Sequence, residues 1–219
     1  MHKNIKKQKI NFKKGFTLVE LLITITMFVI VTGVVLVNSN SFDSSVLLNN
    51  FAYDVALTIK QAQSYGVNVR ETSNFRDVGL NQFNSAYGVF FDLTQSNTNF
   101  VLFNDAPATD GTYNRIYDSS ITTCSVDDPE CIQKYTIRKG NIIKSICAGS
   151  GPDDCPDGVS KVEKLSILFQ RPNLAALIYS ETSGILSSAQ PYAKVTLSAE
   201  SGATQAVVVT SVGQIYVKK

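Results

Sequence analysis

The sequence predicts an α+β protein in which a long N-terminal helix packs on an antiparallel β-sheet. The first observation behind this prediction is a helical pattern of apolar residues that starts near the N-terminus and continues to about Val69. The second is a series of short apolar segments, separated by turn residues, that fills residues 70–219. Strands that pack on one long helix define the α+β class.

Residues 16–37 form the apolar half of the expected helix. These 22 residues contain no lysine, arginine, aspartate, histidine or proline. As a helix they span about 33 Å at roughly 1.5 Å per residue, enough to cross a bilayer. The preceding residues 1–15 carry six lysines, which predicts a cytoplasmic N-terminus and an exported remainder. Residues 34–45 offer no small-residue cleavage pattern, so we expect the run to be retained as a single-pass anchor.

Residues 38–69 form the amphipathic half. The segment begins with a polar stretch, NSNSFDSS, that we expect to turn, and helical spacing resumes at Val46. One face is apolar and is predicted to lie against the sheet: Leu48, Phe51, Ala52, Val55, Ile59 and Ala62. The other face is polar: Asn49, Asn50, Asp54, Lys60, Gln61 and Ser64.

Residues 70–219 are predicted to form a β-rich head domain with one sheet of moderate size. Hairpins are expected where two apolar segments flank a short run of turn residues. The expected strand regions are 87–93 with 99–105, 135–146 about a turn at Lys139-Gly140-Asn141, 164–170, 193–199 with 205–211, and 214–219.

Composition argues against several classes of function. The first fifteen residues hold six of the 20 basic residues and none of the 18 acidic ones, so the remaining 14 basic residues leave a net charge of −4. An acidic body does not favour an overall electrostatic grip on nucleic acid. His2 is the only histidine, and neither a phosphate-binding glycine loop nor G-x-S-x-G occurs. We therefore expect neither an enzyme nor a bound cofactor.

Four cysteines fall in one window, at Cys124, Cys131, Cys147 and Cys155. In an exported domain they predict disulfides, and four cysteines allow three pairings. Loop lengths favour Cys124–Cys131 with Cys147–Cys155. The alternative is a zinc site, although the spacings are longer than those of the usual cysteine knuckles.

Acidic residues cluster beside these cysteines, at Asp127, Asp128 and Glu130 and at Asp153, Asp154 and Asp157. Carboxylates on a loop are suitable Ca²⁺ ligands, and a solvated loop rich in turn formers is the alternative. Neither cluster has the D-x-D-x-D-G spacing of a calcium loop. We therefore predict no metal site.

The junction between leader and apolar run reads Lys14-Gly15-Phe16-Thr17-Leu18-Val19-Glu20-Leu21-Leu22. A short basic leader ending in glycine, then phenylalanine, then glutamate at the fifth position resembles the type III signal of type IV pilins and type II secretion pseudopilins. The resemblance implies that prepilin peptidase cuts between Gly15 and Phe16 on the cytoplasmic side and N-methylates Phe16. The apolar helix then remains in a mature chain of residues 16–219.

The same resemblance gives Glu20 a role in assembly. An ionisable group near the centre of a hydrocarbon layer costs about 2.5–3.5 kcal/mol. Cleavage creates a cationic amine at Phe16, and in a filament core that amine is costly alone as well. Placing Glu20 of one subunit opposite the Phe16 amine of its neighbour offsets both costs. The alternative places Glu20 among the lipid headgroups.

The segment from Leu47 to Arg70 is similar to the one that follows the membrane helix in H-type pseudopilins and FimT-type minor pilins, with Gln63 in place of an arginine. The resemblance implies a minor subunit of a type IV pilus or of a type II secretion filament. Its partners would be other pilins or pseudopilins, prepilin peptidase and, before assembly, the cytoplasmic membrane. The head would be periplasmic or extracellular.

Two alternatives stay open. FimT-type minor pilins include DNA-binding members of competence pili, whose C-terminal signature is arginine-rich. Here Gln214 takes an arginine's place, and only Lys218 and Lys219 offer phosphate contacts. The other alternative is an unrelated β domain on a single-pass anchor.

Overall fold

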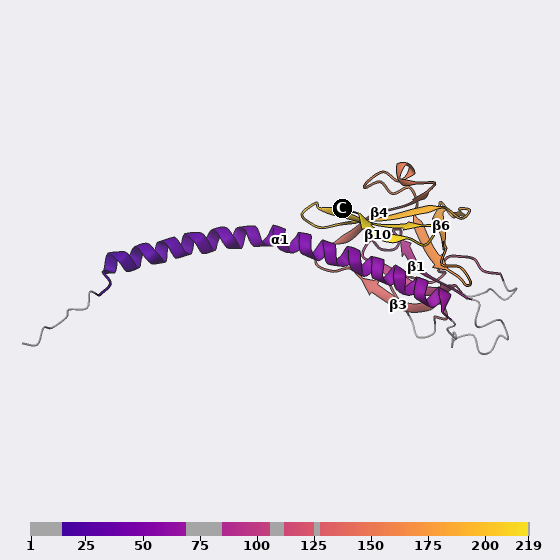
Figure 1. The fold of residues 1–219 in the computed structure, drawn as a ribbon, viewed down its shortest axis with the longest axis horizontal. Helices are drawn as coiled ribbons and strands as arrows, with labels where there is room; N and C mark the ends of the chain where they lie inside the picture. Colours follow the sequence, from indigo (N-terminus) through magenta and orange to yellow (C-terminus); the bar gives the residue numbers. More distant parts are fainter. Residues whose placement is uncertain (1–14, 69–84, 106–111, 125–127, 219) are drawn as a thin grey trace, which may run out of the picture. The chain divides into compact units, whose positions relative to one another are not determined.

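The computed structural model describes residues 15–68, 85–105, 112–124 and 128–218, with the backbone alone for residues 37–43. The leader up to Lys14, together with Val69 and Lys219, lies outside the described residues. The chain divides into two compact units, Met1–Phe42 and Asp43–Lys219. Figure 1 labels the elements of both units.

The backbone is helical from Leu18 to Val67 (α1). The turn expected across residues 38–45 is therefore wrong, because these residues are helical as well. Serine and asparagine favour caps and turns through side-chain bonds to the backbone. Each costs a helix no more than about 0.7 kcal/mol relative to alanine. Since α1 contains no proline, no residue in this stretch stops the helix.

The strands form two antiparallel sheets rather than the single sheet predicted. The six-stranded sheet has the order β3 (Cys131–Thr136), β2 (Asn99–Asp105), β1 (Ala86–Asp92), β5 (Lys164–Phe169), β6 (Ala176–Thr182), β7 (Ile185–Leu186). The four-stranded sheet has the order β10 (Ile215–Lys218), β9 (Thr204–Thr210), β8 (Tyr192–Ser198), β4 (Ile142–Gly149). A short 3₁₀ helix, Pro152–Asp154, lies in the loop after β4.

Two predicted hairpins are confirmed, and a third is wrong. β1 pairs with β2, and β8 pairs with β9. The turn at Lys139–Gly140 exists, with φ of 61° and 73°, yet it carries the chain from β3 in one sheet to β4 in the other. The β1–β2 connection accounts for this, because Ile137 N donates to Thr98 O and Ile143 N to Asn97 O, both at 2.7 Å. The flanking segments thus bond to this connection instead of to each other.

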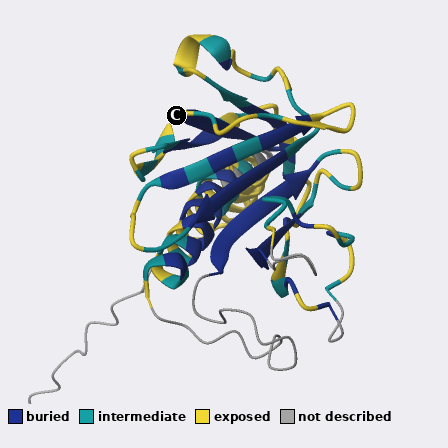
Figure 2. Cartoon of the chain, turned by 90° about the vertical axis from the view of Figure 1, so that its right-hand side faces the viewer, coloured by how far each residue is buried: buried dark blue, intermediate teal, exposed yellow. Residues whose placement is uncertain are grey.

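The second half of α1 has the apolar face that the sequence predicts. Leu48, Ala52, Val55, Ile59 and Ala62 are all buried. They belong to one core cluster with residues of both sheets, so a single helix face is shared by the two sheets. Figure 2 shows the helix of this unit against the dark blue strands that enclose the core. Phe51 packs partly buried at the edge of this cluster.

Two close backbone contacts fix the C-terminal end of α1. A Cβ at Gly66 would lie 2.3 Å from Phe169 O, so glycine is needed where the helix meets β5. One turn earlier, Gln63 Nε2 donates to Leu174 O and to Gly213 O, both at 3.1 Å. Gly213 has φ of 86°, a left-handed conformation that favours glycine. Gln63 therefore joins two loops of the head to the helix.

The outer faces of the two sheets are covered separately. Phe90, Val101, Phe103 and Leu168 of the six-stranded sheet pack against Tyr117 and Ile121 from the segment after β2. Cys147, Tyr192 and Val208 of the four-stranded sheet pack against Cys155 from the loop after β4. Strands β1 and β8 are consequently buried along their whole length.

We expect Ile59→Ala to lower the free energy of unfolding by about 2–5 kcal/mol, because the side chain is fully buried between helix and sheets. The matched control is Leu57→Ala, which truncates a side chain on the same helix that is 64% exposed. Its effect should stay within about 0.5 kcal/mol. Urea unfolding of the detergent-solubilised chain measures both, and equal losses would contradict the assigned helix face.

Candidate functional site: the N-terminal junction and the disulfide covers

The predicted processing junction leads directly into the start of α1. Gly15 and Phe16 precede the helix, and the Phe16 side chain is 78% exposed within the chain. A Cβ added to Gly15 would meet no other atom within 4 Å among the described residues. Among the described residues, Gly15 and Phe16 are therefore accessible and lie outside the helix, as a cleavage site requires.

Thr17 caps the helix, and Glu20 lies in its first turn. Thr17 Oγ1 accepts a hydrogen bond from Glu20 N at 3.2 Å, and Thr17 O accepts one from Leu21 N at 3.2 Å. The spacing T-x-x-E is that of a capping box, in which the threonine satisfies a free helix N–H. A carboxylate in the first turn also faces the positive end of the helix dipole. Glu20 thus stabilises the start of α1 before any neighbour is present.

Glu20 is the only ionisable residue in the segment Leu18–Leu36, which has a mean hydropathy of 2.5 and is long enough to cross a membrane. The threonines of this segment bond to their own helix: Thr24 Oγ1 donates to Leu21 O at 2.8 Å and Thr26 Oγ1 to Leu22 O at 2.7 Å. Thr32 Oγ1 donates to Phe28 O in the same way. Polar hydroxyls are therefore satisfied inside the helix, and the carboxylate is the group that still requires a counter-charge.

The first disulfide, Cys124–Cys131, closes the cover over the six-stranded sheet. Within this cover Tyr117 Oη donates to Asp128 Oδ2, and Asp128 Oδ1 accepts Glu130 N at 3.0 Å. Burial, followed by the bond to Asp128, raises the pKa of Tyr117 well above its usual range. The buried tyrosine is therefore a neutral donor that anchors the loop on the sheet.

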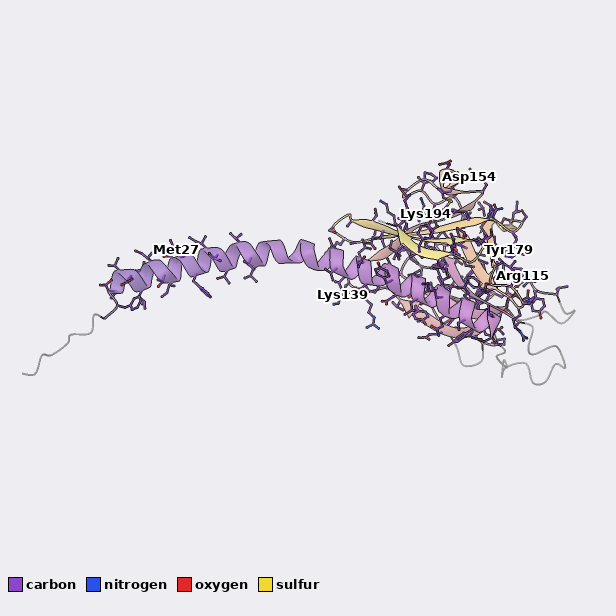
Figure 3. The ribbon with its side chains drawn as sticks, in the orientation of Figure 1. Met27, Arg115, Lys139, Asp154, Tyr179 and Lys194 are labelled. Atoms are coloured by element: carbon purple, nitrogen blue, oxygen red, sulfur yellow. A yellow bond between two sulfur atoms is a disulfide. The ribbon has the colours of Figure 1, made fainter. Side chains whose placement is uncertain are left out.

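The second disulfide, Cys147–Cys155, closes the cover over the four-stranded sheet. Under this loop lies Lys194, whose side chain is 4% exposed. Its Nζ donates to Cys155 O and, at 2.8 Å, to Asp157 Oδ1. The bond from Lys194, followed by its charge, lowers the pKa of Asp157. Lys194, labelled in Figure 3, therefore stabilises this loop from beneath.

Four of the acidic residues considered as calcium ligands have local partners, namely Asp128, Glu130, Asp154 and Asp157. Asp154 Oδ2 accepts Ser150 N at 2.9 Å, Glu130 Oε2 accepts Asp118 N at 3.2 Å, and Asp128 and Asp157 bond as described above. Asp127 lies outside the described residues. In the ranges that the structure describes, no group of three or more His, Cys, Asp or Glu side chains is arranged to hold a metal ion. All four sulfur atoms considered for zinc are in the two disulfides, the pairing that the loop lengths favour.

The structure separates the remaining predicted residues from the junction. Lys218 ends β10 with an exposed side chain in the head, whereas Gly15, Phe16 and Glu20 belong to the other unit. Sequence reasoning did not assign roles to Gln63 and Lys194. Gln63 replaces an expected arginine. Lys194 stands at a polar position of the alternating segment AKVTLS, a pattern that by itself predicts an exposed side chain.

Comparison with protein families matches residues 10–36 to the prokaryotic N-terminal methylation motif. The match contains the junction at Gly15–Phe16, Glu20 and the apolar first half of α1. This motif supports a type IV pilin- or pseudopilin-like prepilin, a structural subunit that prepilin peptidase processes and that assembles with other pilins. Comparisons with curated proteins and with solved structures found no match.

We predict that protein taken from the cell envelope contains no free thiol and two intramolecular bridges. Proteolysis without reductant, followed by mass spectrometry, should recover peptides linked through Cys124–Cys131 and Cys147–Cys155. Each closed loop should stabilise the fold by about 2–3 kcal/mol through the unfolded state. Four thiols that react with iodoacetamide before reduction, or a bridge between the two covers, would contradict this arrangement.

Proposed function

We propose that the protein is a minor subunit of a type IV pilus or type II secretion filament, cut after Gly15 and methylated on Phe16. The observation that carries the proposal is the combination of the methylation motif at residues 10–36 with a helix capped at Thr17 and one carboxylate in its first turn. The motif supports processing by prepilin peptidase. The start of the helix places Glu20 in the first turn, four residues after the new amine at Phe16.

Assembly follows from the charges that cleavage leaves in an apolar helix. The new α-amine at Phe16 is one turn from Glu20, and both lie at the end of a segment whose side chains are exposed within the single chain. Burying that segment against other helices removes its apolar surface from lipid or water, but it also buries an amine and a carboxylate. We propose that the Glu20 carboxylate pairs with the Phe16 amine of a neighbouring subunit, which offsets both penalties and fixes the axial register.

The unit from Asp43 onward is proposed to be the head, displayed outside the cytoplasmic membrane in the periplasm or on the filament. Support comes from the six lysines of the leader, which favour a cytoplasmic N-terminus, and from the two disulfides, which persist outside the cytoplasm. Minor status rests on the resemblance of residues 47–70 to H-type pseudopilins and FimT-type pilins.

DNA binding is the weaker candidate. It would rest on Lys218 and Lys219, and Lys218 lies close enough to the Asp157 carboxylate to lower the pKa of that group. Two lysines supply at most two phosphate contacts, which are weak and easily lost in salt. We therefore propose the structural role alone, and the motif weighs against an unrelated β domain on a plain anchor.

Mass spectrometry of the native protein should find N-methyl-phenylalanine, Phe16, as the first residue of a 204-residue chain, Phe16 to Lys219. Gly15→Leu should block cleavage, because the peptidase must approach the backbone at this position. Gly33→Leu, a matched change within the apolar helix, should leave cleavage intact. A native chain that keeps its leader, or that begins beyond Val37, would show that the junction is not the processing site.

Glu20→Ala should leave membrane insertion and cleavage unchanged and should prevent entry into filaments. The change removes an insertion cost of up to about 2.5–3.5 kcal/mol, yet it leaves a neighbour's Phe16 amine unpaired in the helix core. Thr17→Ala is the matched control, because it removes the cap of the same helix and keeps the carboxylate. Its loss is limited to about 0.5–2 kcal/mol of helix stability.

The readout is the amount of each variant in membranes and in sheared filaments. Glu20→Gln, which keeps the shape and loses the charge, should be as defective as Glu20→Ala. If Glu20→Ala assembled as well as wild type, the charge-pairing role would be wrong, and the alternative position of Glu20 among the lipid headgroups would be favoured. A defect in Thr17→Ala as large as that in Glu20→Ala would assign the effect to helix capping.

A further inference from the structure

A small hollow lies on the outer face of the four-stranded sheet, next to the second disulfide loop. Three strands present one residue each across its floor, because Lys218 of β10 pairs with Ala206 of β9, and Ala206 pairs with Thr196 of β8. Residues directly opposite one another in antiparallel strands point to the same face of a sheet. The hollow has a volume of about 80 Å³, and Asp157, Thr204 and Gln205 complete its lining.

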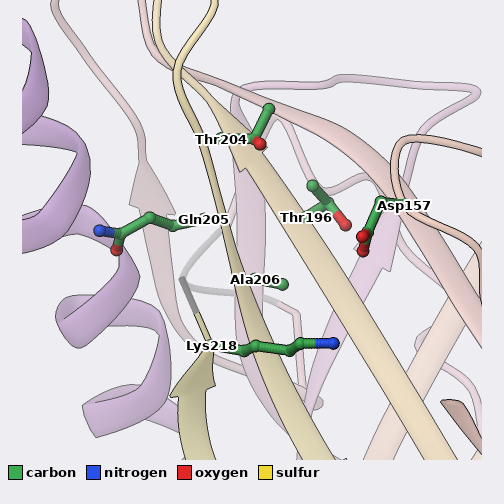
Figure 4. Close-up of a pocket in the computed structure, with 6 residues that line it drawn as sticks. All are labelled: Asp157, Thr196, Thr204, Gln205, Ala206 and Lys218. Carbon is green, nitrogen blue, oxygen red and sulfur yellow. The ribbon is translucent and has the colours of Figure 1, made fainter.

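The hollow exists because Ala206 is small. Its methyl group lies between the longer side chains of Lys218 and Thr196, so the middle strand contributes little volume above the sheet. Figure 4 shows Thr196, Lys218 and Asp157 around Ala206, with Gln205 turned to the opposite side. Gln205 Nε2 bonds to Asn49 Oδ1 of α1 at 3.1 Å, so the neighbouring position on β9 faces the core side.

A buried hydroxyl in the hollow has no partner. Thr196 is 3% exposed, and its Oγ1 makes no hydrogen bond within the described residues. A buried polar group without a partner costs about 1–3 kcal/mol, which a ligand oxygen or a water would recover. Thr196 thus supplies a hydrogen-bond donor directed into a space that the fold leaves empty of protein atoms.

The charges around the hollow favour an anion with a single charge. Asp157 is already paired with Lys194 at 2.8 Å, which neutralises that carboxylate. Lys218 forms no ion pair of its own among the residues described, so it leaves one net positive charge at the rim. One unpaired lysine balances one negative charge, which favours a monoanion over a phosphate dianion.

We propose that this hollow binds a carboxylate group, with Lys218 Nζ as the counter-ion and the hydroxyls of Thr196 and Thr204 as donors. The carboxylate would come from an acidic side chain of a partner protein or from a free small carboxylic acid. One cation and two hydroxyl donors match the single charge and the two acceptor oxygens of a carboxylate. The site belongs to the unit Asp43–Lys219, whereas the N-terminal junction belongs to the other unit.

The test uses the full chain in detergent micelles with ¹³C-labelled alanine and threonine methyl groups, so that Ala206 and Thr196 report on the hollow. The probes are sodium acetate, N-acetyl-glutamate N-methylamide, inorganic phosphate and methylammonium chloride at constant ionic strength. We expect saturable shifts of the two methyl signals with acetate. Saturation by the blocked glutamate as well identifies an acidic side chain as the source, whereas saturation by acetate alone identifies a free acid.

Three variants locate the binding. Lys218→Gln should weaken the affinity for acetate about tenfold, the expected loss of one charge-assisted bond. Ala206→Leu, which fills the hollow and keeps every polar group, should abolish the shift of the Thr196 methyl signal. Thr196→Val should weaken binding as read from the Ala206 methyl signal. Lys60→Gln removes the same charge from the exposed face of α1 and should leave binding unchanged.

Four outcomes would overturn the proposal. The first is the absence of saturable shifts with acetate, which would mean that the hollow holds water only. The second is unchanged binding in Ala206→Leu. The third is an equal loss in Lys218→Gln and Lys60→Gln, and the fourth is tighter binding of phosphate or methylammonium than of acetate.

Discussion

One carboxylate, Glu20, is the only ionisable group in the apolar first half of α1, and its charge must be balanced wherever that helix resides. Within the single chain the helix dipole and the Thr17 cap favour a negative group at this position. In lipid, Glu20 lies near the end of the segment and can reach the headgroups. In a packed helix core neither solution is sufficient, because a buried charge needs an opposite charge in contact. Cleavage after Gly15 would create that opposite charge on every subunit.

The stability of the unit from Asp43 onward depends on how the apolar faces of its helix and sheets are covered. One face of α1, about Ala52 and Ile59, supplies the shared core of two sheets. Each sheet then has an outer face that would be exposed without a cover. The segments carrying Cys124–Cys131 and Cys147–Cys155 provide the two covers, and a buried polar contact lies beneath each of them. A loop of polar residues gains little from burial when the chain folds. The disulfides close to these contacts stabilise the loops instead, because they restrict the loops in the unfolded state.

The parts of the fold that follow from local pattern could be predicted from the sequence. The stripe from Leu48 to Ala62 has helical period, and the turn at residues 200–202 is flanked by two alternating segments. The junction could be predicted because its motif is ordered and contiguous. The division into two sheets could not be predicted, because β4 pairs with β8, a strand distant in sequence. The turn at Lys139–Gly140 reverses the chain, but it does not determine which strand pairs with β4. Lys194 and the hollow above Ala206 depend on that register, so no short segment of sequence encodes them.

The central claim is that Glu20 of one subunit meets the Phe16 amine of another. A cryo-electron microscopy structure of filaments containing this subunit, at a resolution that shows side chains, tests it most directly. We expect a carboxylate oxygen of Glu20 within about 4 Å of the methylated nitrogen of a neighbouring Phe16. A Glu20 carboxylate that bonds only within its own helix, with the neighbouring amine paired to a different group, would contradict the account.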